Sequence, residues 1–319
     1  MPSPENNSMQ GEHLWMPVPD PVMAEVQSHN RGCVAIVTGA SKGLGREITL
    51  ELLRRRVSVI AVARTASKLQ ELRSEALTAA RGHAWYIQCP ADVTTDHGIR
   101  EIEASLSQSG LVLIALVNNA GTINPVASIA KTPMKEWRHQ FETNLFSVVD
   151  MCQRFLPTLR ATRGRIINIS SGAAARPYYG WSAYCSSKAA LNMVTQSLAA
   201  EVPEVMSIAI RPGVMDTDMQ EFVREKCREG MKASEHDKFV KMHSEDKLLD
   251  PTIPAYVIAR IALEGSRDMS GKFYSWDDPQ LDRFRSRQDN AYSPTLGSLG
   301  VSLVSQTILP PELLFNHPH

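Results

Sequence analysis

Long apolar runs and an excess of basic residues are both missing from this sequence of 319 residues. One of the longest apolar runs, Leu111–Val117, is far shorter than the ~18 residues that cross a membrane as a helix, so no membrane span is predicted. The 34 Lys and Arg residues balance 34 Asp and Glu residues. This balance argues against a broad basic surface, and no nucleic-acid partner is predicted.

Paired cysteines and a basic N-terminus are missing as well. The five cysteines are widely spaced and form no CxxC pair, which argues against a disulfide scaffold and for a reducing cytosol. The first 30 residues contain no Lys or Arg, which fits neither a secretory signal nor an Arg-rich transit peptide. We therefore expect a cytoplasmic protein. No metal site is predicted, because His317 and His319 are expected to be exposed tail residues.

The sequence does contain a regular alternation of short apolar segments and amphipathic segments. Apolar runs predict strands at 33–38, 57–63, 85–88, 111–117, 165–170, 205–210 and 272–275. Helical spacing predicts helices at 44–56, 67–80, 95–107, 134–160, 183–201 and 252–264. The alternation predicts an α/β fold with a single doubly wound parallel sheet of Rossmann type and helices on both faces.

Three regions fall outside this alternation. Residues 1–30 are polar and rich in proline and predict a disordered or loosely attached arm, and residues 281–319 predict a C-terminal extension. The catalytic domain is then expected at 31–280. Within it, residues 216–248 are dense in charge, which is typical of a solvated helix pair. Because they directly follow a strand, they also fit a mobile lid over a ligand, and the two interpretations are compatible.

The turn after the first predicted strand has the sequence Thr38-Gly-Ala-Ser-Lys-Gly-Leu-Gly45. Glycines at these positions let the backbone turn sharply, approach a pyrophosphate and pack closely against the sheet. The helix that follows offers unpaired N–H groups and a positive dipole end to the phosphates. The turn therefore predicts a dinucleotide site.

The charge at the end of the second predicted strand bears on the choice between NAD and NADP. A site for NAD usually has Asp or Glu there, bonded to the ribose 2′-OH, whereas this strand is followed by Arg64. Arg64 and Lys42 are cations that can pair with a 2′-phosphate, although both also fit ordinary surface residues. We predict a preference for NADPH/NADP+.

Three polar residues predict a site for proton transfer. Tyr184 and Lys188 are four residues apart in helix 183–201, so they share one helix face. An ammonium beside a phenol lowers the phenol pKa, so Tyr184 can exchange a proton with a substrate oxygen. Ser171 follows strand 165–170, at the edge where an open sheet binds ligands. Its neighbour Ser170 is an alternative for the same role.

Taken in order, these motifs resemble those of the short-chain dehydrogenase/reductase family. The resemblance covers about residues 31–276 and rests on Thr38–Gly45, Asp92-Val93, Asn118–Gly121, Asn144, Ser170-Ser171, Tyr184-x-x-x-Lys188 and Arg211–Thr217. It implies that the catalytic residues are Asn144, Ser171, Tyr184 and Lys188. Together with the turn and the charges above, it predicts the following cofactor-binding residues: Gly39, Ser41, Lys42, Gly43, Leu44, Gly45, Arg64, Asp92, Val93, Asn119, Ala120, Gly121, Tyr184, Lys188, Pro212, Gly213, Val214 and Thr217.

The resemblance also implies a role for each catalytic residue. Ser171 donates a hydrogen bond to the substrate carbonyl, and Tyr184 is the acid. Lys188 also binds the nicotinamide ribose, and Asn144 holds a helix-bending water that relays protons to Lys188. Asp92 contacts the adenine. The implied activity is that of an NADPH-dependent carbonyl reductase acting on a small-molecule ketone or aldehyde.

The second half of the chain is similar to a fungal branch of benzil-reductase and sepiapterin-reductase-like enzymes. This similarity lies in Trp181–Ala190, Val214–Gln220, Lys247–Pro251 and Ser270–Asp278. It makes an aromatic dicarbonyl one candidate substrate. A reductase or dehydrogenase dedicated to one biosynthetic metabolite and a non-catalytic NADP(H)-binding sensor are the alternatives.

Two further expectations concern packing. Tyr178, Tyr179, Trp181, Met215 and Met219 fit either an apolar pocket wall or ordinary core packing. The family commonly forms a homodimer or homotetramer through helices 134–160 and 183–201. The residues 148–149 on the first of these helices fit such an interface and equally fit packing on the sheet.

Overall fold

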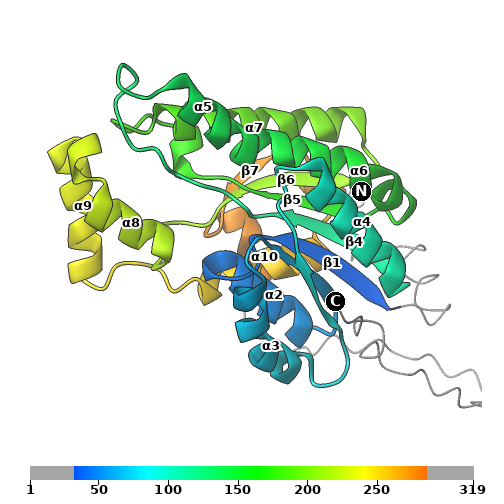
Figure 1. Cartoon of the computed structure of the whole chain (residues 1–319). Helices are drawn as coiled ribbons and strands as arrows, with labels where there is room; N and C mark the ends of the chain where they lie inside the picture. The colour runs from blue at the N-terminus through cyan, green and yellow to red at the C-terminus, as the bar shows by residue number, and fades with distance from the viewer. Residues whose placement is uncertain (1–31, 286–319) are drawn as a thin grey trace, which may run out of the picture. The chain divides into compact units, whose positions relative to one another are not determined.

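The computed structural model describes residues 32–285, so the expectations for the arm at 1–30 and for residues 286–319 lie outside the described residues. Seven strands in this range form one parallel sheet in the order β3-β2-β1-β4-β5-β6-β7 (Figure 1). The predicted fold class is confirmed. The strands are β1 (Cys33–Thr38), β2 (Ser58–Ala63), β3 (Tyr86–Pro90), β4 (Val112–Asn118), β5 (Arg165–Ile169), β6 (Met206–Arg211) and β7 (Phe273–Ser275).

Helices cover both faces of the sheet. One face packs against α2 (Gly43–Arg54), α3 (Ala66–Ala80) and α10 (Thr252–Glu264), and the other against α4 (Asp96–Ser109), α6 (Ser147–Ala161) and α7 (Ser182–Glu201). Alternate side chains of β1 enter the two cores: Ala35 and Val37 enter the first, Val34 and Ile36 the second. Burial on both faces explains why these strands are continuous apolar runs in the sequence.

The helix expected at 134–160 is interrupted. It divides into α5 (Met134–Phe141), a π-helical turn (Glu142–Phe146) and α6. Asn144 lies within this turn and is fully buried, and its side chain bonds to the backbone of Thr122 outside the helix. Short π-helical turns inside α-helices are frequent at functional sites.

The folded core continues beyond residue 280, where the expected domain ended. Leu281 and Phe284 are buried beside α10, the second of them in α11 (Asp282–Arg285). The Arg260 guanidinium donates a hydrogen bond to the Arg283 carbonyl (2.7 Å). Residues up to 285 therefore belong to the same core as the sheet.

The charge-dense segment forms the helices α8 (Asp218–Lys226) and α9 (Ala233–Ser244), which stand to one side of the sheet in Figure 1. Its ends meet in a short backbone ladder, in which the Asp216 N–H donates to the Leu249 carbonyl and the Leu249 N–H to the Val214 carbonyl (both 2.9 Å). The pair contributes to a separate apolar cluster, in which Phe239 of α9 packs with Trp181. The helix-pair interpretation is confirmed.

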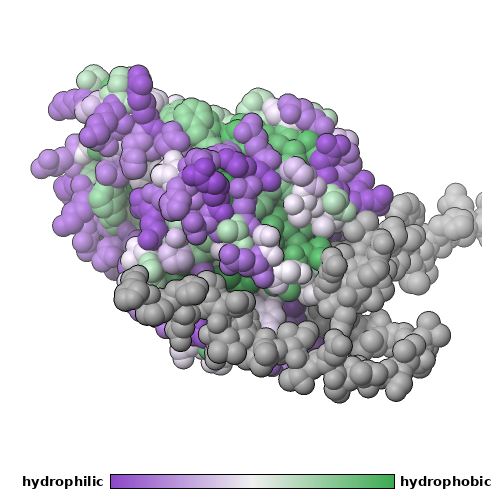
Figure 2. All heavy atoms as spheres, turned by 45° about the vertical axis from the view of Figure 1, so that its right-hand side comes forward, coloured by the Kyte–Doolittle hydropathy of each residue, from purple (hydrophilic) through white to green (hydrophobic). Residues whose placement is uncertain are grey.

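The described surface is mixed in character. Figure 2 shows hydrophilic side chains over much of the described part, with smaller apolar patches between them. Within residues 32–285, no helix combines the length and the apolar character needed to cross a membrane. All five cysteines are free thiols.

Candidate active site

The strand order reverses between β1 and β4, and open parallel sheets bind ligands at the carboxyl ends of the strands beside such a reversal. A cavity of about 440 Å³ lies at this edge. Its walls come from the turn after β1, from the ends of β2, β4 and β5, and from the segment between β6 and α8. The topology therefore gathers motifs that are far apart in the sequence.

The glycine-rich turn forms one wall of the cavity. Gly39 has a φ of +66°, and a Cβ there would lie 2.9 Å from Asn119 Nδ2, so a side chain is excluded by both conformation and space. A Cβ on Gly45 would lie 2.3 Å from the Gly39 carbonyl oxygen. The Thr38 hydroxyl accepts hydrogen bonds from the backbone N–H groups of Asn119 and Ala120 (both 3.0 Å). These contacts fix the turn against the end of β4.

The start of α2 faces this cavity without a side-chain cap. Its N-cap residue, Lys42, makes no capping hydrogen bond to the helix, so the first N–H groups of α2 are available to an anion. Together with the tight glycine turn at Gly39, which lines the cavity, this arrangement fits the pyrophosphate of a nicotinamide dinucleotide.

Most of the predicted cofactor residues line the cavity: Gly39, Ser41, Lys42, Gly43, Leu44, Arg64, Asp92, Val93, Asn119, Ala120, Gly121, Tyr184, Lys188, Pro212, Gly213 and Thr217. Two do not. Gly45 packs beneath the turn, and Val214 packs into the apolar cluster under α8 and α9. Both support the wall of the cavity from behind.

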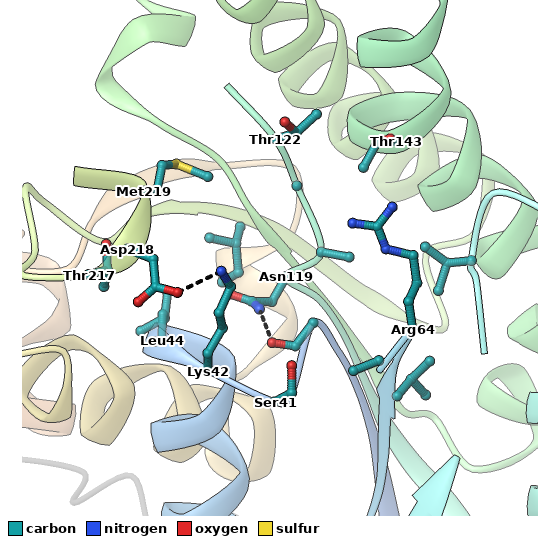
Figure 3. A pocket seen from close by; sticks show the side chains of 18 of the residues that line it. Ser41, Lys42, Leu44, Arg64, Asn119, Thr122, Thr143, Thr217, Asp218 and Met219 are labelled. Atoms are coloured by element: carbon teal, nitrogen blue, oxygen red, sulfur yellow. Dashed lines mark hydrogen bonds and ion pairs between the residues drawn. The ribbon is translucent and has the colours of Figure 1, made fainter. Parts of the chain in front are cut away.

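The two predicted phosphate-binding cations lie in different surroundings. Arg64 extends from the end of β2 across the cavity toward Thr143 (Figure 3). Lys42 Nζ lies 2.7 Å from Asp218 Oδ2, in an ion pair that joins the glycine-rich turn to α8. Lys42 was expected to face a 2′-phosphate, and a partner within the chain was not foreseen. Its hydrogen bond holds the pKa of Asp218 below its usual value, and the nearby charge of Lys68 adds to this effect.

Sequence reasoning missed several residues of the cavity wall, among them Lys68, Thr122, His139, Thr143 and Asp218. Asp218 directly follows a predicted residue, and Lys68 lies in the first turn of the helix after β2, so position along the chain offered some signal. His139 and Thr143 come from α5 and the π-helical turn, and nothing local in the sequence points to them.

Ser171, rather than Ser170, lies beside Tyr184. The Ser171 side chain hydrogen-bonds the Tyr184 phenol and also accepts from the Ala173 N–H (3.1 Å). The Ser170 hydroxyl is buried and donates to Asn192 Oδ1 (2.7 Å) on α7. These partners favour Ser171, the serine that the sequence predicts, over the alternative Ser170.

Burial controls the ionisation of Tyr184 and Lys188. Lys188 Nζ lies 5.9 Å from the centre of the Tyr184 ring and donates to the Ile169 carbonyl (2.8 Å). Burial raises the pKa of Tyr184 to about 12, although the hydrogen bond from Ser171 acts in the opposite direction. Burial lowers the pKa of Lys188 to about 8. The sequence predicts a lowered Tyr184 pKa, whereas in this geometry the pKa is raised, with desolvation as the main cause.

Asn144 ties the loop after β4 to α7. Its Oδ1 accepts from the Thr122 N–H (2.8 Å), and its Nδ2 donates to the Thr122 carbonyl (2.8 Å) and to the Ser187 hydroxyl (3.1 Å). A Cβ on Gly121 would lie 3.3 Å from Asn144 Oδ1 and 3.6 Å from Lys188 Nζ. The amide therefore stands beside the ammonium, and its part in a proton relay stays a prediction.

Buried polar side chains hold α7 in place on the sheet. Asn118 Nδ2 donates to Asn168 Oδ1, and Asn168 Nδ2 donates to the Thr195 hydroxyl (both 2.9 Å). All three residues are buried. Because a buried polar network is costly unless its groups are paired, these bonds favour one placement of α7, and with it of Tyr184 and Lys188.

The aromatic residues near Tyr184 pack in the core rather than line the cavity. The Trp181 ring stacks on Phe239 of α9 (5.6 Å, 13°) and meets the Tyr184 ring edge-on (5.9 Å, 89°). Tyr178 joins this stack, and Tyr179 is 56% exposed. The pocket-wall interpretation fails for these three residues. The rings of Tyr178 and Trp181 pack against α9, and Tyr179 faces solvent. Met215 and Met219 do line the cavity.

A parallel sheet with a glycine-rich dinucleotide turn, and a Ser-Tyr-Lys group at its carboxyl edge, defines a nucleotide-dependent oxidoreductase. The sequence model of the short chain dehydrogenase family matches residues 33–228. The chain belongs to the short-chain dehydrogenase/reductase family, whose members are oxidoreductases that bind nicotinamide cofactors.

Within this family, the chain is similar to proteins named benzil reductase and sepiapterin reductase. A benzil reductase ((S)-benzoin forming) of Saccharomyces cerevisiae is 34% identical over 262 residues, which cover 78% of this chain and 98% of the relative. A sepiapterin reductase of Mus musculus is 32% identical over 238 residues, covering 70% and 90%. The crystal structure of the KRED1-Pglu enzyme is 38% identical, with a TM-score of 0.71, and covers 76% of this chain and 99% of that one. The similarity to benzil and sepiapterin reductases is confirmed.

Proposed function

We propose that this protein is an NADPH-dependent carbonyl reductase that converts a ketone or aldehyde to an alcohol. The observation that carries the proposal is the placement of Ser171, Tyr184 and Lys188 beside the cavity that the glycine-rich turn lines. Two hydroxyl donors and one buried ammonium at the edge of a dinucleotide site suit the reduction of a carbonyl.

The surroundings of the cavity support NADPH as the cofactor. The turn at Gly39 and the open start of α2 suit the pyrophosphate, and besides Lys188 three further cations line the cavity: Lys42, Arg64 and Lys68. The end of β2 offers no carboxylate to a ribose 2′-OH, since Ala63 is followed by Arg64. When bound, the nicotinamide ring would supply a hydride to the carbonyl carbon.

The chain's own residues would handle the oxygen of the substrate. Ser171 and Tyr184 would donate hydrogen bonds to the carbonyl oxygen, where negative charge develops in the transition state. Its raised pKa keeps Tyr184 protonated at neutral pH, so the phenol holds the proton that the new alkoxide requires. The Lys188 ammonium, close to the ring, would stabilise the phenolate that remains.

We further propose an apolar substrate, with an aromatic dicarbonyl as one example. Met215 and Met219 line the cavity, and the apolar side chains of Ile123 and Val223 pack in the cluster that includes Tyr184. The name of the yeast relative, benzil reductase, supports this class. A reductase dedicated to one biosynthetic metabolite would use the same catalytic groups.

A cytoplasmic location is proposed as well. Supporting it, a solved structure from Saccharomyces cerevisiae that is 32% identical to this chain is described as a cytoplasmic protein.

The test is the consumption of NADPH by the purified full-length protein with benzil, other aromatic diketones, a pterin ketone, quinones and simple aldehydes. We expect turnover of an aromatic dicarbonyl, with NADPH used in preference to NADH. Tyr184→Phe should lower kcat by ~10²–10⁴-fold, the usual contribution of a general acid, while the Kd for NADPH stays nearly unchanged. Tyr179→Phe, at an exposed tyrosine outside the cavity wall, is the matched control. Retained activity in Tyr184→Phe would place the acid elsewhere, and silence across the panel with NADPH still bound would favour the sensor or a dedicated substrate.

A further inference from the structure

One of the cations of the cofactor cavity is already paired with a carboxylate of the chain. Lys42 of the glycine-rich turn and Asp218, the first residue of α8, point toward each other in Figure 3, with Nζ and Oδ2 separated by 2.7 Å. Both side chains are more than half exposed, at 57% and 59%. An exposed pair of this kind is weak and exchanges its partners easily.

Asp218 is the carboxylate of the cavity wall that competes for this lysine. The other carboxylate in the wall, Asp92, accepts hydrogen bonds from the backbone N–H and the hydroxyl of Thr94 (3.0 and 2.8 Å). Asp218 instead faces Lys42, with the charge of Lys68 nearby, and its pKa lies below its usual value. It is therefore ionised at neutral pH, and its Oδ2 already pairs with the Lys42 ammonium.

The backbone next to the pair fixes this arrangement. Thr217, which precedes Asp218, lies against the turn, since a Cβ on Gly43 would be 3.3 Å from Thr217 Cγ2. Because Thr217 lies close to Gly43, its neighbour Asp218 faces Lys42 when α8 is in its observed position.

We propose that Asp218 is a residue that sets cofactor specificity, because its carboxylate competes with the 2′-phosphate of NADP(H) for Lys42. NADP(H) must displace the Asp218 carboxylate from Lys42 to pair its 2′-phosphate with this lysine, whereas NAD(H) lacks the 2′-phosphate and needs no such exchange. Asp218 thus lowers the preference for NADP(H) that Lys42 and Arg64 create. The exchange also releases the ion pair between α8 and the glycine-rich turn. The inference rests on the proposed use of NADPH.

The experiment measures Kd for NADP+ and for NAD+ by calorimetry, at one fixed salt concentration, on the full-length chain. Asp218→Asn should tighten NADP+ binding about three- to fivefold, the upper range for an exposed ion pair, and change the Kd for NAD+ less than about twofold. Glu221→Gln removes an exposed carboxylate of α8 that lies outside the cavity wall. This control should leave both Kd values unchanged.

A double-mutant cycle identifies the partner. In the Lys42→Met background, Asp218→Asn should no longer change the ratio of the two Kd values, because no lysine remains to be shared. If Asp218→Asn still changes this Kd ratio threefold or more in the Lys42→Met background, Asp218 acts on the phosphate directly. That outcome would overturn the proposal.

The failure of this inference differs from the failure of the proposed cofactor. A wild-type protein that binds NAD+ as tightly as NADP+ refutes the NADPH assignment and the inference with it. A wild-type protein that prefers NADP+, with a Kd ratio that Asp218→Asn leaves unchanged or reduces, refutes the role of Asp218 alone.

Discussion

At the scale of single residues, burial is the main influence on the protonation of the predicted catalytic groups. Tyr184 and Lys188 are both buried, and desolvation moves each pKa toward the neutral form, to about 12 for the phenol and about 8 for the ammonium. The phenol is therefore protonated throughout the ordinary pH range. The group whose charge changes within this range is Lys188.

The difference between the pKa values of Tyr184 and Lys188 predicts how carbonyl reduction depends on pH. Lys188 is charged below a pKa of about 8 and loses its proton as the pH rises through that value. Since the charged form stabilises the phenolate, kcat/KM should be constant from pH 6 to 7 and should fall about tenfold per unit well above pH 8. Initial rates with saturating NADPH would measure this profile, with circular dichroism at each pH as the control for folding. A rate that stays flat to pH 10 would contradict the role of the Lys188 charge.

At the scale of elements, the α8–α9 pair is fastened to the rest of the domain by close backbone contacts. A Cβ on Gly180 would lie 1.9 Å from the Gly230 carbonyl oxygen, and a Cβ on Gly230 would lie 2.1 Å from the Val126 carbonyl oxygen. The Ala127 N–H donates to the Gly180 carbonyl (2.9 Å), and the Tyr179 N–H to Glu235 Oε2 (3.0 Å). These contacts restrict motion of the segment where α8 and α9 join, whereas its first turn, near the cavity, carries the weak Lys42 ion pair.

The contact at Gly180 predicts a large effect of one added methyl group. Gly180 and Gly82 both have positive φ values (+81° and +72°), but a Cβ on Gly82 meets no atom within 4 Å. Gly82→Ala should cost ~1–2 kcal/mol of unfolding free energy, from the backbone conformation alone. Gly180→Ala should cost a further ~1–3 kcal/mol, because the methyl group overlaps with Gly230.

Urea denaturation of the two variants measures this difference. Equal losses of stability in Gly180→Ala and Gly82→Ala would show that the backbone at Gly230 moves away without cost. The contact would then not fasten the α8–α9 pair.

At the scale of the whole molecule, large apolar side chains are exposed on the helices expected to form an assembly interface, and Phe146 and Met193 are among them. Phe146, in the π-helical turn before α6, is 51% exposed, and Met193 of α7 is 60% exposed. Val148 is buried against the sheet, so its packing is explained without a partner. An exposed Phe and Met favour an interface on this side of the domain.

We expect the full-length chain to sediment as a homodimer or homotetramer. The double variant Phe146→Glu, Met193→Glu should shift it toward the monomer, because an interface core does not accept unpaired charges. Leu77→Glu is the matched control, since Leu77 of α3 is also 51% exposed. Sedimentation velocity measures the distribution. A wild-type monomer, or an assembly that the double variant leaves intact, would contradict the predicted interface.

Much of the fold was predictable because it depends on local patterns. Continuous apolar runs, such as β1 and β4, mark strands that are buried on both faces, and helical spacing marks the helices between them. No local pattern marks the break in the helix at 142–146, where Asn144 bonds to the backbone of Thr122, although the family resemblance implies a bend at Asn144. The burial of Phe284 was missed for a similar reason, because its contacts lie in distant α10.

The sequence by itself determined which chemical groups the site contains and the order in which the chain presents them. The glycine-rich turn, Ser171, Tyr184 and Lys188 are short motifs, and their spacing carries most of their meaning. Only the tertiary structure decided the partners of these groups. Ser171 lies beside Tyr184 whereas Ser170 bonds to α7, and Lys42 pairs with Asp218. These pairings join residues that are distant in the chain, so they depend on how helices and strands pack, which no local pattern encodes.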